Sequence, residues 1–192
     1  MLEECGLPYN VHKINIGTNT EQFAPEYLKI NPNGKIPSIV DPDGPDGKPI
    51  ALMESGAILL YLAGKTGKFL PRSVRGRYEA LQWLMFQMGG VGPMFGQAHH
   101  FMRAKKDEIP YGSERYGTEA KRLYGVMDRR LSQRKFFADE YSIADMAIYP
   151  WVARHEWHRV DLGEFANVKR WYDAVGARAA VVKGMAVPQV NV

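Results

Sequence analysis

A carboxylate and a hydroxyl stand side by side where two apolar segments of this chain meet. In "IALMESGAILLYL" (residues 50–62), Glu54 and Ser55 separate a strand-like run from a helix-like run. The first N–H groups of a helix lack internal partners and its dipole adds partial positive charge, so this end favours an anion. Glu54 beside it would attract an amine, and the pair suits the head group of an α-amino acid. The alternative is an ordinary polar helix cap.

A second candidate is "NPNGKIPSIVD" (residues 31–41). Pro37 stands at the start of a strand-like run, where it removes no bond from a β-ladder. A cis bond before Pro37 would turn the backbone of Ile36 outward, free to pair with an extended peptide. Because cis is the minority state of X–Pro bonds, these residues by themselves favour trans.

The elements that position these residues form a mixed α/β half. Apolar runs predict strands at residues 9–16, 36–41 and 50–53, the first of them without clean alternation. "APEYLKI" (24–30) predicts a short helix with a proline in its first turn. The turn-rich segment 41–49 predicts a hairpin with a long loop between the second and third strands.

Long helical periodicity follows. Apolar residues recur three or four positions apart in three stripes. These are Leu81, Leu84, Met85 and Met88; Tyr116, Ala120, Leu123, Met127 and Leu131; and Ala144, Ala147, Ile148 and Trp151. Each stripe favours a buried helix face over a binding site. The predicted fold class is therefore α/β followed by all-α, with domains at residues 1–70 and 71–192 and a ligand cleft between them.

Composition narrows the function classes. A hydrophobic content of 45% and a charged content of 24% are ordinary for a soluble globular protein, and no apolar run approaches the length of a membrane span. The net charge of +4 comes without a recognised nucleic-acid-binding motif, which argues against nucleic acid as a partner. Cys5 is the single cysteine, so an internal disulfide is excluded and a cytoplasmic location is predicted.

Three features imitate functional sites. Cys5 has no partner cysteine and is predicted to be a buried structural thiol. Ser142 and Asp145 have the S-x-x-D spacing of a capping box and are predicted to start a helix. "HEWH" (155–158) is one residue shorter than the H-E-x-x-H zinc motif, so no metal is predicted.

Several motifs together resemble the cytosolic glutathione transferase family. "NPNGKIPSIVD" and "LMESGAILLYLAGKTG" resemble its thioredoxin-like N-terminal half, and "YSIADMAIYPW" and "NVKRWYDAVGAR" its helical half. "LQWLMFQMGGVGPMFGQAHHF" narrows the resemblance to the bacterial nu class, whose members resemble glutathione-dependent disulfide oxidoreductases. The resemblance covers nearly the whole chain.

The resemblance implies a glutathione site. Its residues are Gln22, Lys35, Ile36, Pro37, Glu54 and Ser55. Glu54 and Ser55 would bind the γ-glutamyl end, and a cis-proline would expose Ile36 to the cysteinyl backbone. Gln22 of "QFAPEYL" would touch glutathione as well, and Lys35 would lie near the glycine carboxylate.

The resemblance also suggests residues for a second pocket, which would hold the substrate that reacts with glutathione. Met94 and His100 fall in the helix that would wall the cleft, and they are candidates for contact with an electrophilic substrate. The alternative is that both are packed helix residues.

The start of the chain departs from the family pattern. "MLEECGLPY" resembles the end of the family's first helix, with Gly6 as its C-cap. In the family, a strand, a turn and half a helix precede this point, on the order of 15 to 20 residues. The residue that stabilises the glutathione thiolate belongs to that part, so the catalytic residue is expected upstream of Met1.

The resemblance implies glutathione-dependent reduction of disulfides or peroxides, with weaker conjugation of glutathione to electrophiles. Glutathione would be the co-substrate, without a metal, and the family pairs as symmetric homodimers. Trp83, Phe86 and Met88 are the predicted source of apolar surface for pairing. The alternative is a non-catalytic glutathione-binding or scaffold protein of the same fold.

Overall fold

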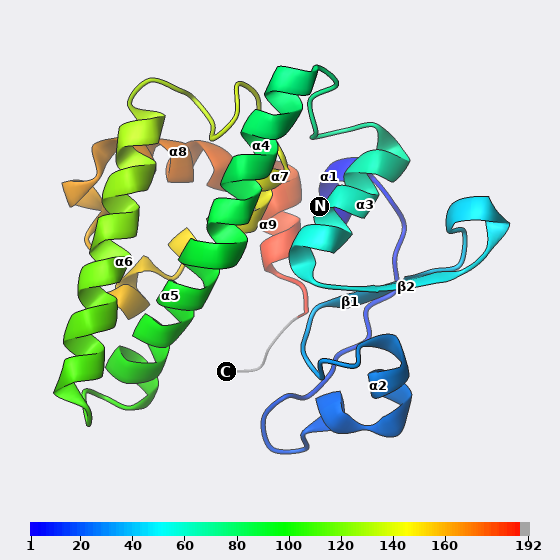
Figure 1. Cartoon of the computed structure of the whole chain (residues 1–192), viewed down its shortest axis with the longest axis horizontal. Coiled ribbons are helices and arrows are strands. Elements are labelled where there is room, and N and C mark those ends of the chain that lie inside the picture. Colours follow the sequence, from blue (N-terminus) through cyan, green and yellow to red (C-terminus); the bar gives the residue numbers. More distant parts are fainter. Residues whose placement is uncertain (189–192) are drawn as a thin grey trace.

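A small α/β unit is followed by a bundle of helices in the computed structural model, which describes residues 1–188 (Figure 1). The first unit comprises α1 (Leu2–Cys5), α2 (Pro25–Ile30), β1 (Ser38–Asp41), β2 (Ile50–Met53) and α3 (Ser55–Thr66). The second comprises α4 (Val74–Phe86), α5 (Gly92–Ala98), α6 (Pro110–Leu131), α7 (Ile143–Val152), α8 (Ala166–Gly176) and α9 (Ala179–Met185). The predicted fold class is confirmed. Within the described part of the chain, no helix is both long and apolar enough to cross a bilayer.

The β-hairpin determines which residues meet. Strands β1 and β2 are antiparallel, with Ser38 opposite Met53, and lie between α3 and α2 (Figure 1). In such a pair, the residues before the first strand and after the second lie at the same end. The hairpin therefore brings Pro37 to the side of Glu54. The long hairpin loop predicted at residues 41–49 is confirmed.

The strand predicted at residues 9–16 is wrong. These residues have no regular secondary structure, and Val11 and Ile16 are about half exposed, at 51% and 52%. A strand needs a neighbour that accepts and donates its backbone hydrogen bonds. Among the described residues, the sheet contains only β1 and β2, so segment 9–16 has no such neighbour.

The core of the helical unit follows the predicted stripes with one exception. Leu123, Met127 and Leu131 on α6 are at most 1% exposed, as is Leu84 on α4. Met85, which was predicted to be buried, is 53% exposed. Consecutive helix residues are rotated by about 100°, and this rotation places Met85 outside the buried face.

The predicted dimer surface at Trp83, Phe86 and Met88 stays a prediction. Trp83 and Phe86 pack against the core of the helical unit, and Met88 packs against a second apolar cluster. All three side chains are only partly buried by these contacts. The exposed apolar side chains of α4 are instead Val74 (74%), Tyr78 (67%) and Met85. Their spacing of four and seven residues places them on one face of the helix.

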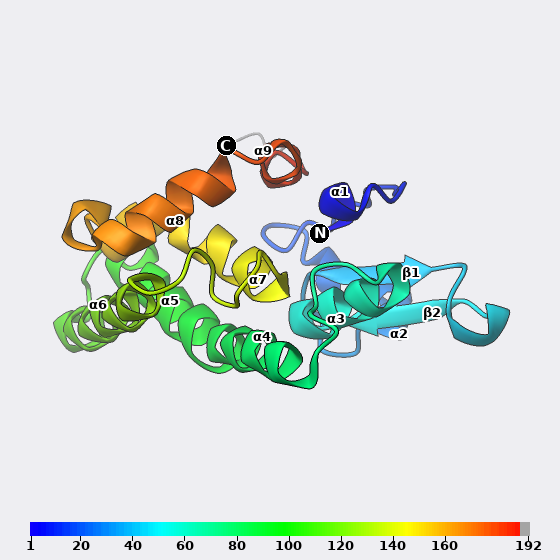
Figure 2. The same ribbon diagram turned by 90° about the horizontal axis from the view of Figure 1, so that it is seen from above.

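The two units share apolar contacts. Leu59 and Ala63 of α3 form one buried cluster with Leu84 of α4 and with residues of α7. The Ile143 N–H donates to the Phe69 carbonyl at 3.0 Å. Helix α9 lies beside α1 although the two are far apart in sequence (Figure 2). The domain division at residues 70/71 stays a prediction.

The features that imitate sites have structural explanations. Cys5 is buried as predicted, with its Sγ 3.6 Å from the Thr66 hydroxyl, and Gly6 is the left-handed C-cap of α1. Ser142 and Asp145 form the predicted capping box of α7. Residues 155–158 form a 3-10 turn. Over residues 1–188, no three His, Cys, Asp or Glu side chains lie close enough to hold a metal ion.

Candidate functional site

The N-terminus of α3 has no side-chain cap within the described chain. Glu54 is the N-cap residue and Ser55 begins the helix, but the Glu54 side chain makes no capping hydrogen bond. The Ser55 hydroxyl points to Met88 Sδ at 3.8 Å, a weak acceptor. The alternative of an ordinary side-chain cap is therefore wrong for Glu54, and the first-turn N–H groups remain available to a ligand.

Glu54 has an unusual backbone conformation. Its φ is 66° and its ψ is 114°, in a region that residues with a side chain seldom adopt. Such a conformation costs on the order of 1–3 kcal/mol, and it occurs most often at functional sites. Here it keeps an exposed carboxylate directly beside the positive end of α3.

Met88 connects the helical unit to this helix end. It lies in the π-helical turn Gln87–Val91, directly after α4. A Cβ placed on Gly56 would come within 3.1 Å of Met88 Sδ, so glycine permits this close approach. Met88 was predicted to belong to a core stripe, and its contact with Ser55 was not predicted, since the two residues are 33 positions apart.

The peptide bond between Ile36 and Pro37 is cis, as the family resemblance implied and contrary to the preference of isolated X–Pro bonds. Ile36 is 50% exposed and precedes the β-ladder, which begins at Ser38. Its backbone is therefore positioned beside Glu54 and outside the sheet pairing.

Gln22 and Lys35 lie against the same loop. Gln22 is 8% exposed, and its Nε2 donates to the Ile16 carbonyl at 3.4 Å. Its buried Oε1 has no hydrogen-bond partner among residues 1–188. The Gln22 carbonyl approaches Gly34, whose Cβ would come within 3.3 Å of it, and Lys35 follows with an exposed side chain. Gln22 thus lies against Gly34, and segment 34–37 connects this contact to the hairpin end that carries Glu54.

Met94 and His100 belong to different surroundings. Met94 packs partly against the core of the helical unit. His100 is exposed, with its ring edge-on to Phe101 at 5.0 Å between centroids. Met88 is the residue of this region in contact with Ser55. The assignment of Met94 and His100 to a substrate pocket stays a prediction.

Two histidines of the helical unit have lowered pKa values. His99 and His158 stack with ring centroids 4.4 Å apart. Burial, reinforced by nearby cationic or imidazole groups, lowers the pKa of His99 to about 4 and that of His158 to about 3. Both rings lie among aromatic side chains such as Trp157 and Phe95, which explains the shifts without a catalytic role.

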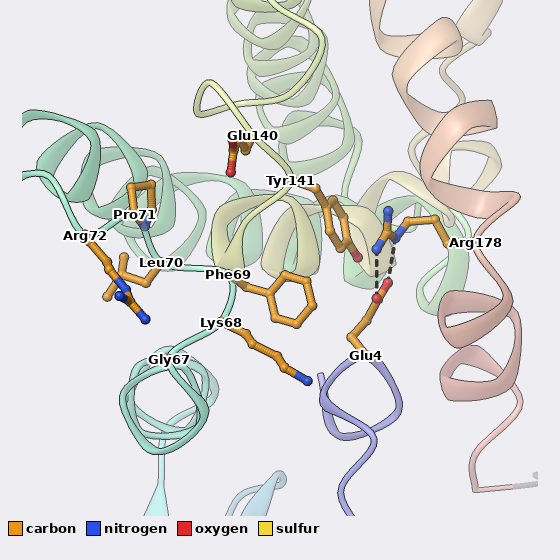
Figure 3. A pocket seen from close by; sticks show the side chains of 10 residues that line it. All are labelled: Glu4, Gly67, Lys68, Phe69, Leu70, Pro71, Arg72, Glu140, Tyr141 and Arg178. Carbon is orange, nitrogen blue, oxygen red and sulfur yellow. Dashed lines mark hydrogen bonds and ion pairs between the residues drawn. The ribbon is translucent and has the colours of Figure 1, made fainter.

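A cavity of about 670 Å³ lies at the other end of α3 (Figure 3). Its wall includes Lys68, Arg72 and Tyr141, and on one side the Arg178 guanidinium donates two hydrogen bonds to the Glu4 carboxylate, at 2.6 and 2.8 Å. A helix of 12 residues is about 18 Å long, so this cavity is separate from the N-terminus of α3.

Comparisons with known proteins agree with this geometry. Residues 1–65 match the family model "Glutathione S-transferase, N-terminal domain", and residues 88–179 match "Glutathione S-transferase, C-terminal domain". The chain is 47% identical to the Escherichia coli disulfide-bond oxidoreductase YfcG, covering 99% of this chain and 89% of that protein. It is 40% identical to YghU of the same organism, covering 100% of this chain and 70% of that protein.

Solved structures of glutathione transferases superpose closely on this chain. A glutathione transferase from Burkholderia graminis, with two glutathione molecules bound per subunit, superposes with a TM-score of 0.90 at 49% identity, covering 98% of this chain and 81% of that one. One from Pseudomonas putida, with one glutathione disulfide bound per subunit, gives 0.93 at 47% identity, covering 97% and 84%. This chain belongs to the glutathione S-transferase family.

Proposed function

We propose that this protein binds glutathione at the hairpin end and uses it to reduce disulfides. The observation that carries the proposal is the N-terminus of α3, which has no side-chain cap and holds Glu54 at a φ of 66°. The relatives support the chemistry, since YfcG and YghU are disulfide-bond oxidoreductases by name. The Pseudomonas putida relative holds glutathione disulfide, the product of such a reaction.

Each site residue has a role in this proposal. The γ-glutamyl carboxylate accepts from the first N–H groups of α3 and from the Ser55 hydroxyl, and the amine pairs with Glu54. The cysteinyl backbone pairs with Ile36. Gln22 Oε1 accepts from a ligand N–H, and Lys35 lies near the glycine carboxylate.

The reaction consists of two thiol–disulfide exchanges. The glutathione thiolate attacks one sulfur of the substrate disulfide, forming a mixed disulfide and releasing a thiolate. A second glutathione attacks the glutathione sulfur of the mixed disulfide, giving glutathione disulfide and a second released thiol. The chain binds and orients the nucleophile. Reduction of peroxides and conjugation to electrophiles are secondary proposals that use the same thiolate.

The test compares Glu54→Gln with Glu26→Gln, an exposed carboxylate that pairs with Lys29 on α2. We expect the wild-type protein and Glu26→Gln to reduce bis(2-hydroxyethyl) disulfide at equal rates with glutathione. Glu54→Gln should raise the KM for glutathione about tenfold or more, because a charged hydrogen bond is lost. Glutathione binding without reduction of any model disulfide would favour the alternative, a non-catalytic glutathione-binding or scaffold protein.

We also propose a homodimer that pairs through α4. The exposed face of Val74, Tyr78 and Met85 supports it, because three large apolar side chains are otherwise left in water. Tyr78→Glu should convert the dimer to a monomer in analytical ultracentrifugation, whereas Tyr111→Glu, at an equally exposed tyrosine on α6, should not. A monomeric wild-type protein would refute the pairing.

We also propose that the protein is located in the cytoplasm. It rests on Cys5, the single cysteine of the chain, which excludes an internal disulfide, and on the supply of reduced glutathione that the proposed reaction needs. Cell fractionation followed by immunoblotting tests it, and recovery outside the cytoplasmic fraction would refute it.

A further inference from the structure

A buried polar network lies beneath segment 35–38, of which residues 35–37 are exposed. Asn31 is 2% exposed and Tyr27 is 9% exposed, although both side chains are polar. Such groups are costly to bury unless they form hydrogen bonds. Their partners here are the Lys35 carbonyl and the Ser38 hydroxyl, which are the groups on either side of Ile36 and Pro37.

The donors and acceptors of this network match. The Tyr27 hydroxyl and Asn31 Nδ2 each donate to the Lys35 carbonyl at 2.6 Å, which occupies both of its lone pairs. Asn31 Nδ2 donates its second hydrogen to Ser38 Oγ at 3.2 Å. Ser38 in turn can donate to the Tyr27 hydroxyl, 3.0 Å away. Every hydrogen then has an acceptor.

The orientation of Asn31 is itself determined. The Asn33 N–H donates to Asn31 Oδ1 at 3.0 Å, so the amide oxygen faces Asn33 and the amide nitrogen faces the segment. The Asn31 N–H donates to the Tyr27 carbonyl at the end of α2, at 2.8 Å. The Gly34 N–H donates to the Asn31 carbonyl at 3.0 Å. The network therefore connects α2 to the start of β1.

We propose that Asn31 and Tyr27 are positioning residues for glutathione, acting through the backbone on both sides of Ile36. This inference rests on the proposed binding of glutathione at the hairpin end. Neither side chain need touch the ligand. By anchoring Lys35 and Ser38, they hold Ile36 in a single backbone arrangement beside Glu54, so that less conformational freedom is lost when glutathione binds.

Three variants test the proposal by titration calorimetry with reduced glutathione. Asn31→Ala leaves the buried Lys35 carbonyl with one donor, and we expect the dissociation constant to rise about tenfold. Tyr27→Phe keeps the ring and removes only the hydroxyl, and we expect a rise of about three- to tenfold. Asn33→Ala is the matched control. Its side chain is exposed, its backbone N–H still reaches Asn31, and we expect an unchanged constant.

A fourth variant separates positioning from general loop structure. Asn31→Asp keeps the shape and the acceptor for Asn33 but removes the donor to Lys35. If the donor positions Ile36, this variant binds glutathione as weakly as Asn31→Ala, and both raise the KM for glutathione while kcat at saturation changes less than about twofold. If Asn31→Asp binds as tightly as the wild type, Asn31 only shapes the turn and the proposal is wrong.

The remaining outcomes are also decisive. Wild-type affinity in both Asn31→Ala and Tyr27→Phe would overturn the positioning role and leave the proposed function standing. A wild-type protein that does not bind glutathione would overturn both. If Asn31→Ala does not fold, Tyr27→Phe alone decides, because it adds no cavity around the ring.

Discussion

Two helices of this protein have a serine at their start, Ser142 as the N-cap of α7 and Ser55 as the first residue of α3, and they differ in how their first turns are satisfied. At α7, the Ser142 hydroxyl accepts from the Ala144 N–H at 3.3 Å. Asp145 accepts from the Ser142 N–H at 3.0 Å, from the Phe137 N–H at 3.1 Å and from the Trp171 indole at 2.8 Å. At α3, neither Glu54 nor Ser55 gives a comparable cap in the described chain.

The difference fits a structural role for the start of α7 and the proposed binding role for the start of α3. Ser142 and Asp145 are at most 1% exposed, so no ligand reaches them, and burial raises the pKa of the Asp145 carboxyl despite its hydrogen bonds. Glu54 is exposed, and Ser55 is only partly buried. The chain thus completes α7 with its own side chains, whereas we propose that glutathione completes the start of α3. Substitutions at the start of α7 should lower stability and leave glutathione binding unchanged. Substitutions at the start of α3 should weaken glutathione binding and change stability little.

The largest expected effect is on stability, at Asp145. Asp145→Ala leaves buried donors on Ser142, Phe137 and Trp171 without an acceptor. We expect a loss of about 3–5 kcal/mol in the free energy of unfolding. Urea denaturation followed by circular dichroism measures it. A loss below about 1 kcal/mol would show that the network contributes little.

Ser142→Ala should lower the free energy of unfolding by about 1–2 kcal/mol, because one cap bond is lost in a buried position. Its affinity for glutathione should equal that of the wild type when both are folded, and a change would mean that α7 takes part in binding. Urea midpoints and calorimetric titration of the same preparation give both values.

Acidification should destabilise the helical unit through its buried histidines. His99 and His158 have folded-state pKa values of about 4 and about 3, below the ordinary 6.5. The unfolded chain therefore takes up protons first, so stability is full above about pH 6.5 and falls as pH drops toward 4. We expect a loss of roughly 2 kcal/mol between pH 7 and pH 5.5, about 1 kcal/mol from each histidine, with the share of partly exposed His99 reduced by solvent screening.

His99→Gln should flatten this pH dependence, measured as urea midpoints at several pH values. His12→Gln, at an exposed histidine of the N-terminal unit, is the control and should leave the profile unchanged. An identical profile for His99→Gln and the wild type would refute the assignment.

Glu54→Gly tests the strained backbone at the start of α3. Glycine adopts positive φ without a steric penalty, although it loses more conformational entropy on folding. The net result should be a gain of up to about 1 kcal/mol in the free energy of unfolding, together with weaker glutathione binding. A clear loss of stability would show that Glu54 contributes to the fold.

Some features of the fold could be predicted from the sequence because they depend on residues that lie close together in the chain. The capping box at Ser142 and the buried stripe of α6 depend on spacings of three or four residues, and both are confirmed. The strand at residues 9–16 failed because a strand depends on a partner, which a local pattern does not report. The contact of Met88 with Ser55 and the hydrogen bonds of Asn31 were overlooked for a similar reason, since both come from contacts made by the folded chain.

The most direct test is the glutathione affinity of Ser55→Ala, measured by titration calorimetry beside the wild type. If the start of α3 binds the γ-glutamyl group, the dissociation constant rises about 10- to 100-fold, since a hydrogen bond to a charged group is lost. The urea midpoint should stay within error of the wild-type value. An unchanged dissociation constant, or a loss of stability as large as that of Ser142→Ala, would contradict the distinction between the two helix ends.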